Sequence, residues 1–355
     1  MRKIYQLGGS IHQIPFIKFL LEYVEVYTVD NRPQNPGHEL SSNYINNTII
    51  DSNFINKLYT RGSKFSSFGS DLAERIRLEA KNKKDTILYK LTSKITSREI
   101  IMEISAKVNL PYLMPYKLNN INNKSIIIKP NIASGSRGIS ILRNYNYDLL
   151  NKKIDFARSN SLDDKYIIEQ VFEGDNTKYY AEAYCFNNQE PIFVWGKSIQ
   201  RKGTLINDGS VQYGDSFDNS QISEQLKNFI KELVKRIDID FLPLNIDFFI
   251  DNGKIFVIES APRPGGNSLG LMLNIKTKKN YFTNLMYYYL EENEKFISPS
   301  FEKLYDNERM YFITMLDKNN KSYLRIPNDV SLIDEFIYKG DNILNYSGYK
   351  IFALN

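Results

Sequence analysis

The chain has 355 residues, of which 42% are hydrophobic and 25% are charged, and its formal net charge is +5. These values are typical of a globular protein, and the length is sufficient for two or three domains with substantial cores. The mild basic excess is spread along the chain. It therefore does not favour nucleic-acid binding as the main activity, although it suits anionic ligands.

Cysteine and histidine are scarce, since Cys185 is the single cysteine and His12 and His38 are the two histidines. An internal disulfide framework is excluded, and a histidine-rich metal site is disfavoured. Cys185 lies in a strand-like run, which predicts a buried small residue rather than a nucleophile. The amino terminus lacks the pattern of a signal peptide, and no run of about 18 apolar residues occurs. We therefore expect a cytoplasmic protein without a membrane partner.

The first 50 residues indicate the beginning of a doubly wound α/β domain. The pattern predicts a strand at Lys3–Leu7, a glycine turn, a helix from about Ile14 to Tyr23, a strand at Val24–Val29 and a third strand at Thr48–Ile50. The dinucleotide fingerprint G-x-G-x-x-G is absent, which disfavours a nicotinamide cofactor.

Two helices and a domain boundary are expected next. Ser70 is a suitable N-cap for a helix from Asp71 to about Lys81. A second helix is predicted at Thr96–Val108, where apolar residues recur about one turn apart. Pro111 and Pro115 end it and indicate a boundary near residues 110–120.

A loop of small residues then joins two predicted strands, Ser125–Lys129 and Ile139–Leu142. The loop is not a Walker A motif, because G-x-x-x-x-G-K-[ST] is missing. Small residues let backbone N–H groups approach phosphate oxygens, and Lys129 and Arg137 supply positive charge. An ordinary hairpin loop is the alternative.

The remaining elements up to the carboxyl end follow from local patterns. We expect strands at Lys165–Val171, Lys178–Asn187, Pro191–Trp195 and Arg309–Met315, a polar connection at Arg201–Gly209, and helices at Ile222–Arg236 and about Tyr281–Glu292. The helix at Ile222–Arg236 is amphipathic. Its predicted core-facing residues are Leu226, Phe229, Ile230 and Leu233.

The stretch Asn245–Gly266 predicts a β-hairpin with an acidic end. Two acids twelve positions apart share a face only if the loop holds an odd number of residues. We therefore expect a three-residue loop with Gly253 in the left-handed conformation, pairing residue 250 with 254, 247 with 257 and 245 with 259. The predicted apolar face is Ile246, Phe248, Ile250, Phe256 and Ile258, and the predicted polar face is Asn245, Asp247 and Glu259. A cluster of this kind needs water, a base or a cation; a solvated amphipathic hairpin is the alternative.

The order of these pieces resembles the ATP-grasp superfamily of ligases. It is similar in particular to the branch that holds biotin carboxylase, carbamoyl phosphate synthetase and the purine-pathway carboxylating ligases. The resemblance covers roughly residues 3–295. It rests on Ile127–Pro130 with the loop Gly135–Gly138, and on Asp247–Phe249, Ile258–Glu259 and Pro262–Arg263.

The resemblance implies a mixed α/β and α+β chain with the ATP-grasp fold. An amino-terminal Rossmann-like (pre-ATP-grasp) domain would span residues 1–90, and the ATP-grasp domain residues 91–295. Within the latter, a nucleotide lid would cover about residues 120–172 and a large subdomain residues 173–295. Residues 296–355 would form a carboxy-terminal segment with no recognisable chemical motif.

The same resemblance implies the site residues. Lys94 and Lys129 would contact phosphates, under a flap containing Ser134, Gly135, Ser136 and Gly138. A hinge of Glu169, Gln170, Val171 and Phe172 would meet the adenine, and Asp175 the ribose. Asp247 and Glu259 would hold Mg²⁺, and Arg263, Lys129 and Arg201 would act at the reacting group. The cofactors would be ATP and Mg²⁺, with two ions considered and Mn²⁺ as a substitute.

Some positions depart from the family pattern. Ala261 stands where the family often has asparagine after the second metal acid, so Asn245 is a candidate helper. Asp247 stands where relatives usually have glutamate, a longer side chain. Asn176 stands where an acid commonly binds ribose, which is why Asp175 is the suggested substitute.

The function implied is an ATP-dependent ligase that activates a carboxylate as an acyl phosphate, releasing ADP, and couples it to an amine. Two alternatives stay open: a bicarbonate-using carboxylase or carbamoyl phosphate-type synthetase, and a non-catalytic nucleotide-binding protein. The expected partners are a small-molecule acid and amine, and relatives of this kind are commonly homodimers.

Overall fold

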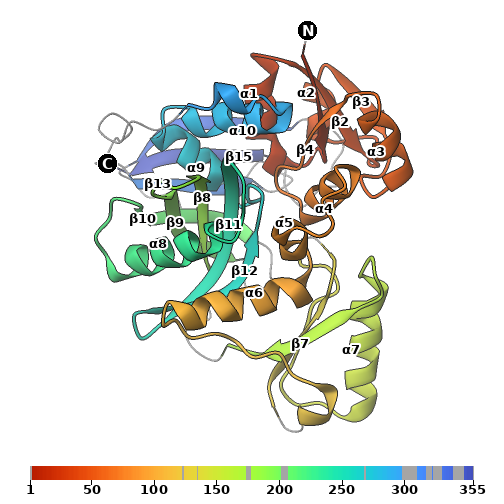
Figure 1. The fold of residues 1–355 in the computed structure, drawn as a ribbon, viewed down its shortest axis with the longest axis vertical. Coiled ribbons are helices and arrows are strands. Elements are labelled where there is room, and N and C mark those ends of the chain that lie inside the picture. Colours follow the sequence, from red (N-terminus) through yellow and green to blue (C-terminus); the bar gives the residue numbers. More distant parts are fainter. Residues whose placement is uncertain are drawn as a thin grey trace.

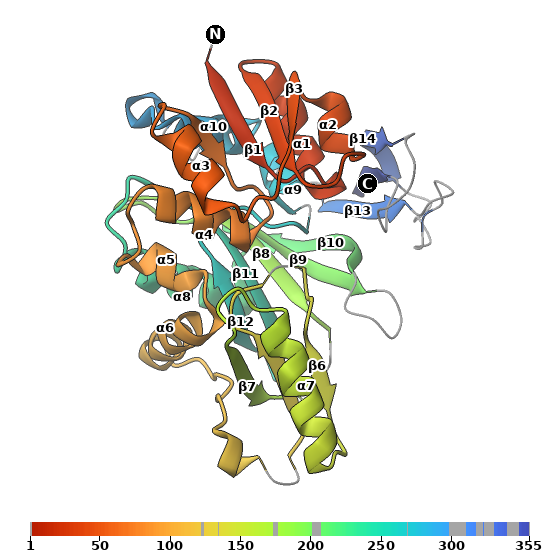
Figure 2. The same ribbon diagram turned by 90° about the vertical axis from the view of Figure 1, so that its right-hand side faces the viewer.

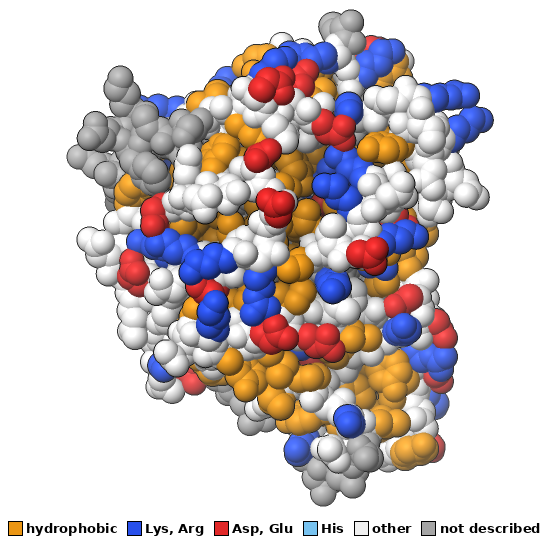
Figure 3. All heavy atoms as spheres, viewed as in Figure 1, with side chains coloured by type: hydrophobic (Ala, Val, Ile, Leu, Met, Phe, Trp, Pro, Cys, Tyr) orange, Lys and Arg blue, Asp and Glu red, His pale blue; other side chains and the backbone are white. Residues whose placement is uncertain are grey.

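The computed structural model of the chain describes residues 2–121, 124–133, 135–172, 177–200, 207–267, 269–297, 310–316, 322, 330–338 and 348–354. These residues form three sheets, which follow one another from top to bottom in Figures 1 and 2 as a four-stranded, an eight-stranded and a three-stranded sheet. On the face seen in Figure 3, basic and acidic side chains are interspersed, in keeping with the small net charge.

The four-stranded sheet is formed by the amino-terminal strands. These strands are β1 (Lys3–Leu7), β2 (Glu25–Asp30), β3 (Asn43–Asn46) and β4 (Lys64–Ser66). They are all parallel and lie in the order β3-β2-β1-β4, which confirms the expected α/β beginning. The helices in this part of the chain are η1 (Ile11–Gln13), α1 (Ile14–Leu21), α2 (Pro36–Leu40), α3 (Ser52–Tyr59) and α4 (Asp71–Ala80).

The prediction of a third strand at Thr48–Ile50 was wrong, because the strand is β3 at Asn43–Asn46. β3 is an edge strand that pairs only with β2, and its residues are mostly exposed. A strand of this kind needs no apolar run, so hydrophobicity cannot reveal it. By contrast, the Ser70 cap of α4 is confirmed, since its side chain accepts a hydrogen bond from the backbone N–H of Ala73 at 3.2 Å.

The three-stranded sheet is an antiparallel unit at the bottom of Figure 2. It consists of β5 (Ile126–Pro130), β6 (Ser140–Leu142) and β7 (Tyr166–Gln170), in the order β6-β5-β7, with helix α7 (Tyr147–Ser159) against it. This unit has a small core of its own, to which Ile126, Ile128 and Leu150 belong. The predicted strands on either side of the small-residue loop are thus confirmed.

The eight-stranded sheet has the order β12-β11-β8-β9-β10-β13-β15-β14. Its strands are β8 (Tyr179–Phe186), β9 (Ile192–Gln200), β10 (Asn207–Asp215), β11 (Phe241–Asp251), β12 (Lys254–Ala261), β13 (Met310–Leu316), β14 (Val330–Ile337) and β15 (Gly348–Leu354). One face packs against helices α5 (Ile87–Leu91), α6 (Lys94–Lys107) and α8 (Gln221–Val234), and the other against α1, α9 (Leu269–Lys276) and α10 (Asn280–Leu290). Two short helices are η2 (Leu118–Asn120) and η3 (Asn293–Lys295), and η3 contacts α10.

Most of the predictions for this sheet are confirmed. The four predicted core residues of α8 are all fully buried, and Cys185 is 2% exposed. The polar connection predicted at Arg201–Gly209 was wrong in its last part, because Asn207 begins β10. Backbone pairing with β9 defines that strand, and its polar residues carry no strand signal. Residues 201–206 lie outside the described part of the chain. No helix in the described ranges is both long and apolar enough to cross a membrane.

The hairpin of β11 and β12 has a different turn from the predicted one. Asp251 pairs with Lys254, and the two turn residues, Asn252 and Gly253, have φ of 47° and 72°. The loop therefore holds two residues, as in the Asn-Gly turns that favour left-handed conformations at both positions. The register then shifts at a bulge between Phe248 and Asp247, so that 247 pairs with 259 and 245 with 261.

The predicted apolar face was consequently wrong for β12. Ile255 and Val257 are fully buried, together with Ile246 and Phe248 on β11, whereas Phe256 is only partly buried. A two-residue turn reverses the faces of the returning strand relative to a three-residue turn. Ile258 lies at the extra position of the bulge, where the alternation of faces is broken.

Candidate active site

Asp247 and Glu259 lie opposite each other on β11 and β12, and each pairs with a lysine. The Nζ atom of Lys178 is 2.5 Å from Oδ2 of Asp247, and the Nζ atom of Lys94 is 3.4 Å from Oε1 of Glu259. All four side chains are at least two-thirds shielded from solvent. The structure thus brings the two predicted metal acids together and places ammonium groups beside them.

Lys94 is the first residue of α6 and follows the N-cap residue Ser93. The backbone N–H of Lys94 donates to the carbonyl of Asn131 at 3.0 Å, and the Ser93 hydroxyl donates to the Asn131 side chain at 2.8 Å. Asn131 directly follows β5. These bonds attach the end of β5, and with it Lys129, to the beginning of α6.

Lys129 lies on β5 and points to Glu169 on β7, with 2.5 Å between its Nζ atom and Oε2. The other oxygen of Glu169 accepts from Nε of Arg98 on α6. Burial opposes the charge of Glu169, but Lys129 and Arg98 outweigh it and lower its pKa. Glu169, which is 1% exposed, is therefore a buried anion between two cations.

Arg98 also holds the bulge of the hairpin. Its guanidinium donates to the carbonyls of Val257 at 3.1 Å and Ile258 at 2.6 Å. Because those residues immediately precede Glu259, Arg98 links the end of β12 to the Lys129–Glu169 pair. This role of Arg98 was not predicted from the sequence, although Arg98 lies four positions after Lys94 on the same helix face.

The predicted hinge consists of the last two residues of β7, Glu169 and Gln170, and the next two residues, and it has an aromatic neighbour. Gln170 is exposed, and the backbone N–H of Val171 donates to the carbonyl of Ser125 at 3.3 Å. Phe172 stacks on Phe249 of β11, with a ring-centroid distance of 4.4 Å and an interplanar angle of 6°. The hinge thus lies against the polar face of the same hairpin that carries Asp247 and Glu259.

The predicted phosphate flap is a turn with left-handed residues, in which Gly135 and Ser136 are exposed and Gly138 is buried. Gly135, Ser136 and Gly138 have φ of 71°, 57° and 75°. A Cβ atom on Gly138 would lie 2.6 Å from Cβ of Asn160 and 2.7 Å from Cγ of Pro130, so no side chain fits there. Three predicted site residues, Ser134, Asp175 and Arg201, lie outside the described part of the chain.

Arg263 is buried and is held by an acid of the amino-terminal region. Its Nε and Nη2 atoms lie 2.9 and 2.7 Å from Oδ1 of Asp71, the first residue of α4. The backbone N–H of Gly69 donates to the carbonyl of Pro264 at 3.1 Å. These contacts fix the Pro-Arg-Pro turn to the beginning of α4 and to the loop that precedes it. Asp71 was predicted only as a helix residue, because its partner is 192 positions away in the chain.

A second acid, Glu182 on β8, lies beside this turn and is fully buried. It accepts hydrogen bonds from the Tyr281 hydroxyl at 2.5 Å, the Gly265 backbone at 2.9 Å and the Asn245 amide at 3.2 Å. Burial raises the pKa of Glu182 to about 7, and these bonds and Arg263 offset only part of that effect. Asn245, the suggested helper of the metal acids, is thus engaged with Glu182.

The charges of the site leave Glu259 strongly acidic. Burial opposes its ionisation, but Lys94, Lys178, Lys129 and Arg263 outweigh burial and lower its pKa to about 2. At Lys178, burial likewise opposes the charge, but Asp247 outweighs it and the pKa is raised. The cleft beside Glu259 is lined by Asp71, Leu91, Thr92, Lys94, Ser97, Arg98, Lys129, Glu169 and Ile258. Lys94, Arg98 and Lys129 thus bring three cations together beside Glu259, and cations of this kind bind phosphate oxygens by charge-assisted hydrogen bonds.

The donor set fits magnesium. Mg²⁺ prefers hard oxygen ligands and is usually held by one or two carboxylates together with substrate phosphates. Asp247 and Glu259 supply two carboxylates at paired positions of one sheet face, and Glu259 is ionised at neutral pH by its lowered pKa. No group of three or more acidic, histidine or cysteine side chains suited to a metal occurs among the described residues.

The parallel amino-terminal sheet, the small antiparallel sheet and the large sheet with its paired acids together have the ATP-grasp fold. The chain thus has the mixed α/β architecture expected from its sequence.

Solved structures of this fold match over nearly the whole chain. N5-carboxyaminoimidazole synthetase from Staphylococcus aureus, complexed with ADP, has a TM-score of 0.69 and 13% identity, covering 99% of this chain and 92% of that one. L-amino acid ligase from Bacillus licheniformis has a TM-score of 0.68 and 12% identity, covering 100% and 93%. The biotin carboxylase domain of 2-oxoglutarate carboxylase from Hydrogenobacter thermophilus, in complex with MgADP, ADP and bicarbonate, has a TM-score of 0.68 and 12% identity, covering 99% and 86%. No protein-family model and no curated protein matches the sequence.

Proposed function

We propose that the chain is an ATP-dependent ligase that activates a carboxylate as an acyl phosphate and couples it to an amine. The observation that carries the proposal is the pairing of Asp247 with Glu259 on one face of a sheet, surrounded by cations. The cations are Lys94, Arg98, Lys129, Lys178 and Arg263. Such a site suits a polyphosphate with its metal ion.

ATP and Mg²⁺ are the proposed cofactors. Two of the similar structures hold ADP, one of them together with its magnesium salt. In this chain Asp247 and Glu259 would hold Mg²⁺, and Lys94 and Lys129 would bind phosphate oxygens. Ser134–Gly138 would close over the phosphates. When bound by these residues, Mg²⁺ would supply positive charge that offsets the negative charge developing on the phosphates during transfer.

The residues of the chain would then position the substrates. An oxygen of the substrate carboxylate attacks the γ-phosphorus of ATP, the bond to ADP breaks, and an acyl phosphate forms. The amine nitrogen attacks its carbonyl carbon, phosphate leaves, and the amine loses a proton. Arg263, with its planar fork of donors, would bind the carboxylate or the acyl phosphate. Arg201 is the further residue proposed to act at the reacting group.

This proposal includes the division of the chain. Residues 1–90 would be the amino-terminal domain and residues 91–295 the ATP-grasp domain, with the lid at about 120–172, the large subdomain at 173–295 and a carboxy-terminal segment at 296–355. The hinge residues Glu169 to Phe172 would meet the adenine, and Asp175 the ribose. We further propose cytoplasmic location and a homodimer.

The test is a screen of ADP release from ATP with pools of carboxylic acids and amines. ADP and phosphate should appear only when the right acid and amine are both present. AMP and pyrophosphate as products would contradict the acyl-phosphate mechanism. Bicarbonate-dependent ADP release without an organic acid would favour a carboxylase, and nucleotide binding without turnover in any pool would favour a non-catalytic role.

A further inference from the structure

Lys178 contacts an acid that was expected to hold a metal ion. Its Nζ atom lies 2.5 Å from Oδ2 of Asp247 and 4.9 Å from the ring centroid of Tyr180. The Lys178 side chain is 24% exposed and that of Asp247 is 14% exposed. The ion pair is therefore well shielded from solvent, where screening is weak.

An ammonium group at this place competes with a divalent ion. Mg²⁺ lies about 2.0–2.1 Å from its carboxylate oxygens and demands near-octahedral geometry. A second ion on Asp247 would have to share one small carboxylate with Lys178, and like charges repel at such short range. The carboxylate of Glu259 has a more distant ammonium neighbour than that of Asp247, because the Nζ atom of Lys94 is 3.4 Å away from it.

The number of acids also limits the number of ions. Two carboxylates, Asp247 and Glu259, face each other, and the described part of the chain offers no group of three metal-ligating side chains. Because Lys178 contacts Oδ2 of Asp247, Asp247 has one fewer oxygen for a metal ion than Glu259. An ammonium has three donors, so it can contact the Asp247 carboxylate and a phosphate oxygen together.

We propose that the Lys178 ammonium replaces one of the two divalent ions considered for this site, so that a nucleoside triphosphate binds with a single ion held mainly by Glu259. This inference rests on the proposed function, because it presumes nucleotide binding at the Asp247–Glu259 pair. Lys178 is then a binding residue for the phosphates and a determinant of metal stoichiometry.

The experiment counts Mn²⁺ ions bound per chain in the presence of a non-hydrolysable ATP analogue, by the electron paramagnetic resonance signal of free Mn²⁺. The wild-type chain should bind one ion, and Lys178→Met, which removes the charge, should bind two. Lys178→Arg should bind one ion, since the charge is kept. Two ions in the wild type, or one in Lys178→Met, would overturn the inference.

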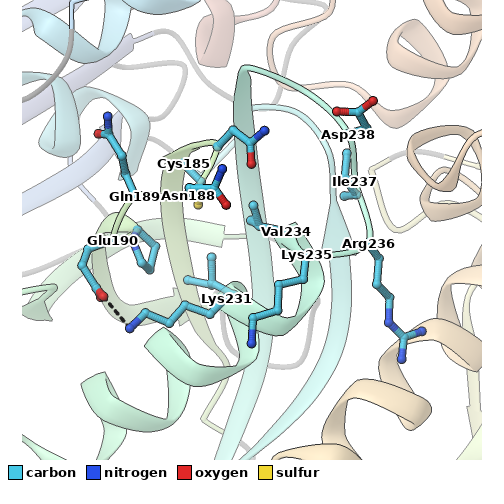
Figure 4. Close-up of a pocket in the computed structure, with 13 residues that line it drawn as sticks. Cys185, Asn188, Gln189, Glu190, Lys231, Val234, Lys235, Arg236, Ile237 and Asp238 are labelled. Atoms are coloured by element: carbon cyan, nitrogen blue, oxygen red, sulfur yellow. Dashed lines mark ion pairs between the residues drawn. The ribbon is translucent and has the colours of Figure 1, made fainter.

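Two matched controls separate this effect from the loss of any ion pair. Lys276→Met removes an equally close, buried pair with Asp215, whose atoms lie 2.5 Å apart. Lys231→Met removes the pair with Glu190, 2.6 Å long, at a separate pocket formed by the β8–β9 turn and the end of α8 (Figure 4). Both variants should bind one ion.

Folding and nucleotide binding are checked in the same samples. If circular dichroism shows that Lys178→Met does not fold, Lys178→Gln is used instead. A wild-type chain that binds two ions overturns the inference whatever the variants do. Failure of the wild-type chain to bind the analogue would instead refute the proposed function, and the inference with it.

Discussion

Asp247 and Glu259 are paired across β11 and β12 although the turn between these strands holds only two residues. An even loop alone would place the two carboxylates on opposite faces. The bulge at Ile258 adds one residue to β12 and so returns Glu259 to the face that carries Asp247. Arg98 stabilises the bulge by donating a hydrogen bond to the Ile258 carbonyl at 2.6 Å. The acidic site therefore depends on an irregularity of the hairpin and on a cation from another element.

Gly253→Ala should destabilise the fold by about 1–2 kcal/mol, because a side chain strains the left-handed conformation at φ 72°. Chemical denaturation followed by circular dichroism measures the change in the free energy of unfolding. The control is Lys254→Ala, at an exposed neighbouring position, which should change that free energy by less than about 0.5 kcal/mol. Equal stability of Gly253→Ala and Lys254→Ala would argue against the left-handed conformation of Gly253.

Glu259→Gln should lower the turnover by about 10³-fold while leaving the fold intact, because a metal ligand contributes several kcal/mol to catalysis. The side chain lies on the polar face and is 34% exposed, so its loss leaves no cavity in the core. ADP release and thermal melting measure the two effects. Glu224→Gln, on the exposed face of α8, should keep full turnover. A Glu259→Gln variant with full Mg²⁺-dependent activity would exclude Glu259 as a metal ligand.

The spacing of apolar residues predicted most helices and strands well, because an element that buries one face must place apolar residues at regular intervals along the chain. In α8, for example, Leu226 and Phe229 are core residues as expected. The pattern failed where backbone pairing rather than burial defines the element, as in the edge strand β3 and in Asn207–Gly209 of β10. The prediction of the turn at Asn252 was wrong for a different reason. A two-residue loop with a bulge and a three-residue loop without one both place the two acids on the same face, so the positions of the acids cannot distinguish them.

The candidate site could be predicted only in part. Four of the predicted site residues belong to short sequence motifs, namely Lys129, Asp247, Glu259 and Arg263. The structure places Asp247 and Glu259 at paired positions. Asp71 and Arg98 belong to ordinary helix patterns, and their partners lie far away in the chain. Long-range ion pairs of this kind leave no periodic signal in a single sequence.

Arg263→Lys should raise the KM for the acid substrate by about 10- to 100-fold and leave the affinity for nucleotide nearly unchanged. Lysine keeps the charge but loses the fork of donors, and a hydrogen bond to a charged group contributes about 1.5–3 kcal/mol. Steady-state kinetics with each substrate varied in turn separates the two effects. Equal losses for acid and nucleotide would contradict the assigned role.

Asp71→Asn provides a matched variant for the same site. It removes the carboxylate that orients Arg263 from α4 but leaves Arg263 in place. The KM for the acid should rise, by less than in Arg263→Lys, because the guanidinium is present but less well positioned. An unchanged KM would mean that Asp71 has no positioning role.

Ionisation of Glu182 should lower the free energy of unfolding as the pH rises through about 7. Its folded pKa, raised to about 7 by burial, exceeds the ordinary value of 4.5. The neutral carboxyl therefore stabilises the fold, and this contribution is complete below about pH 4.5 and is lost as the pH rises through about 7. The shift corresponds to about 3 kcal/mol. Glu182→Gln, which mimics the neutral carboxyl, should remove this dependence.

Chemical denaturation of the wild type and of Glu182→Gln between pH 5 and pH 8 measures the effect as a difference, so that other titrating groups cancel. The free energy of unfolding of Glu182→Gln, relative to that of the wild type, should increase by about 2.5 kcal/mol over this range. Glu224→Gln, at an exposed position of α8, should follow the wild type at every pH. A difference between wild type and Glu182→Gln that stays constant with pH would show that Glu182 titrates in its ordinary range, despite its burial between Tyr281 and Gly265.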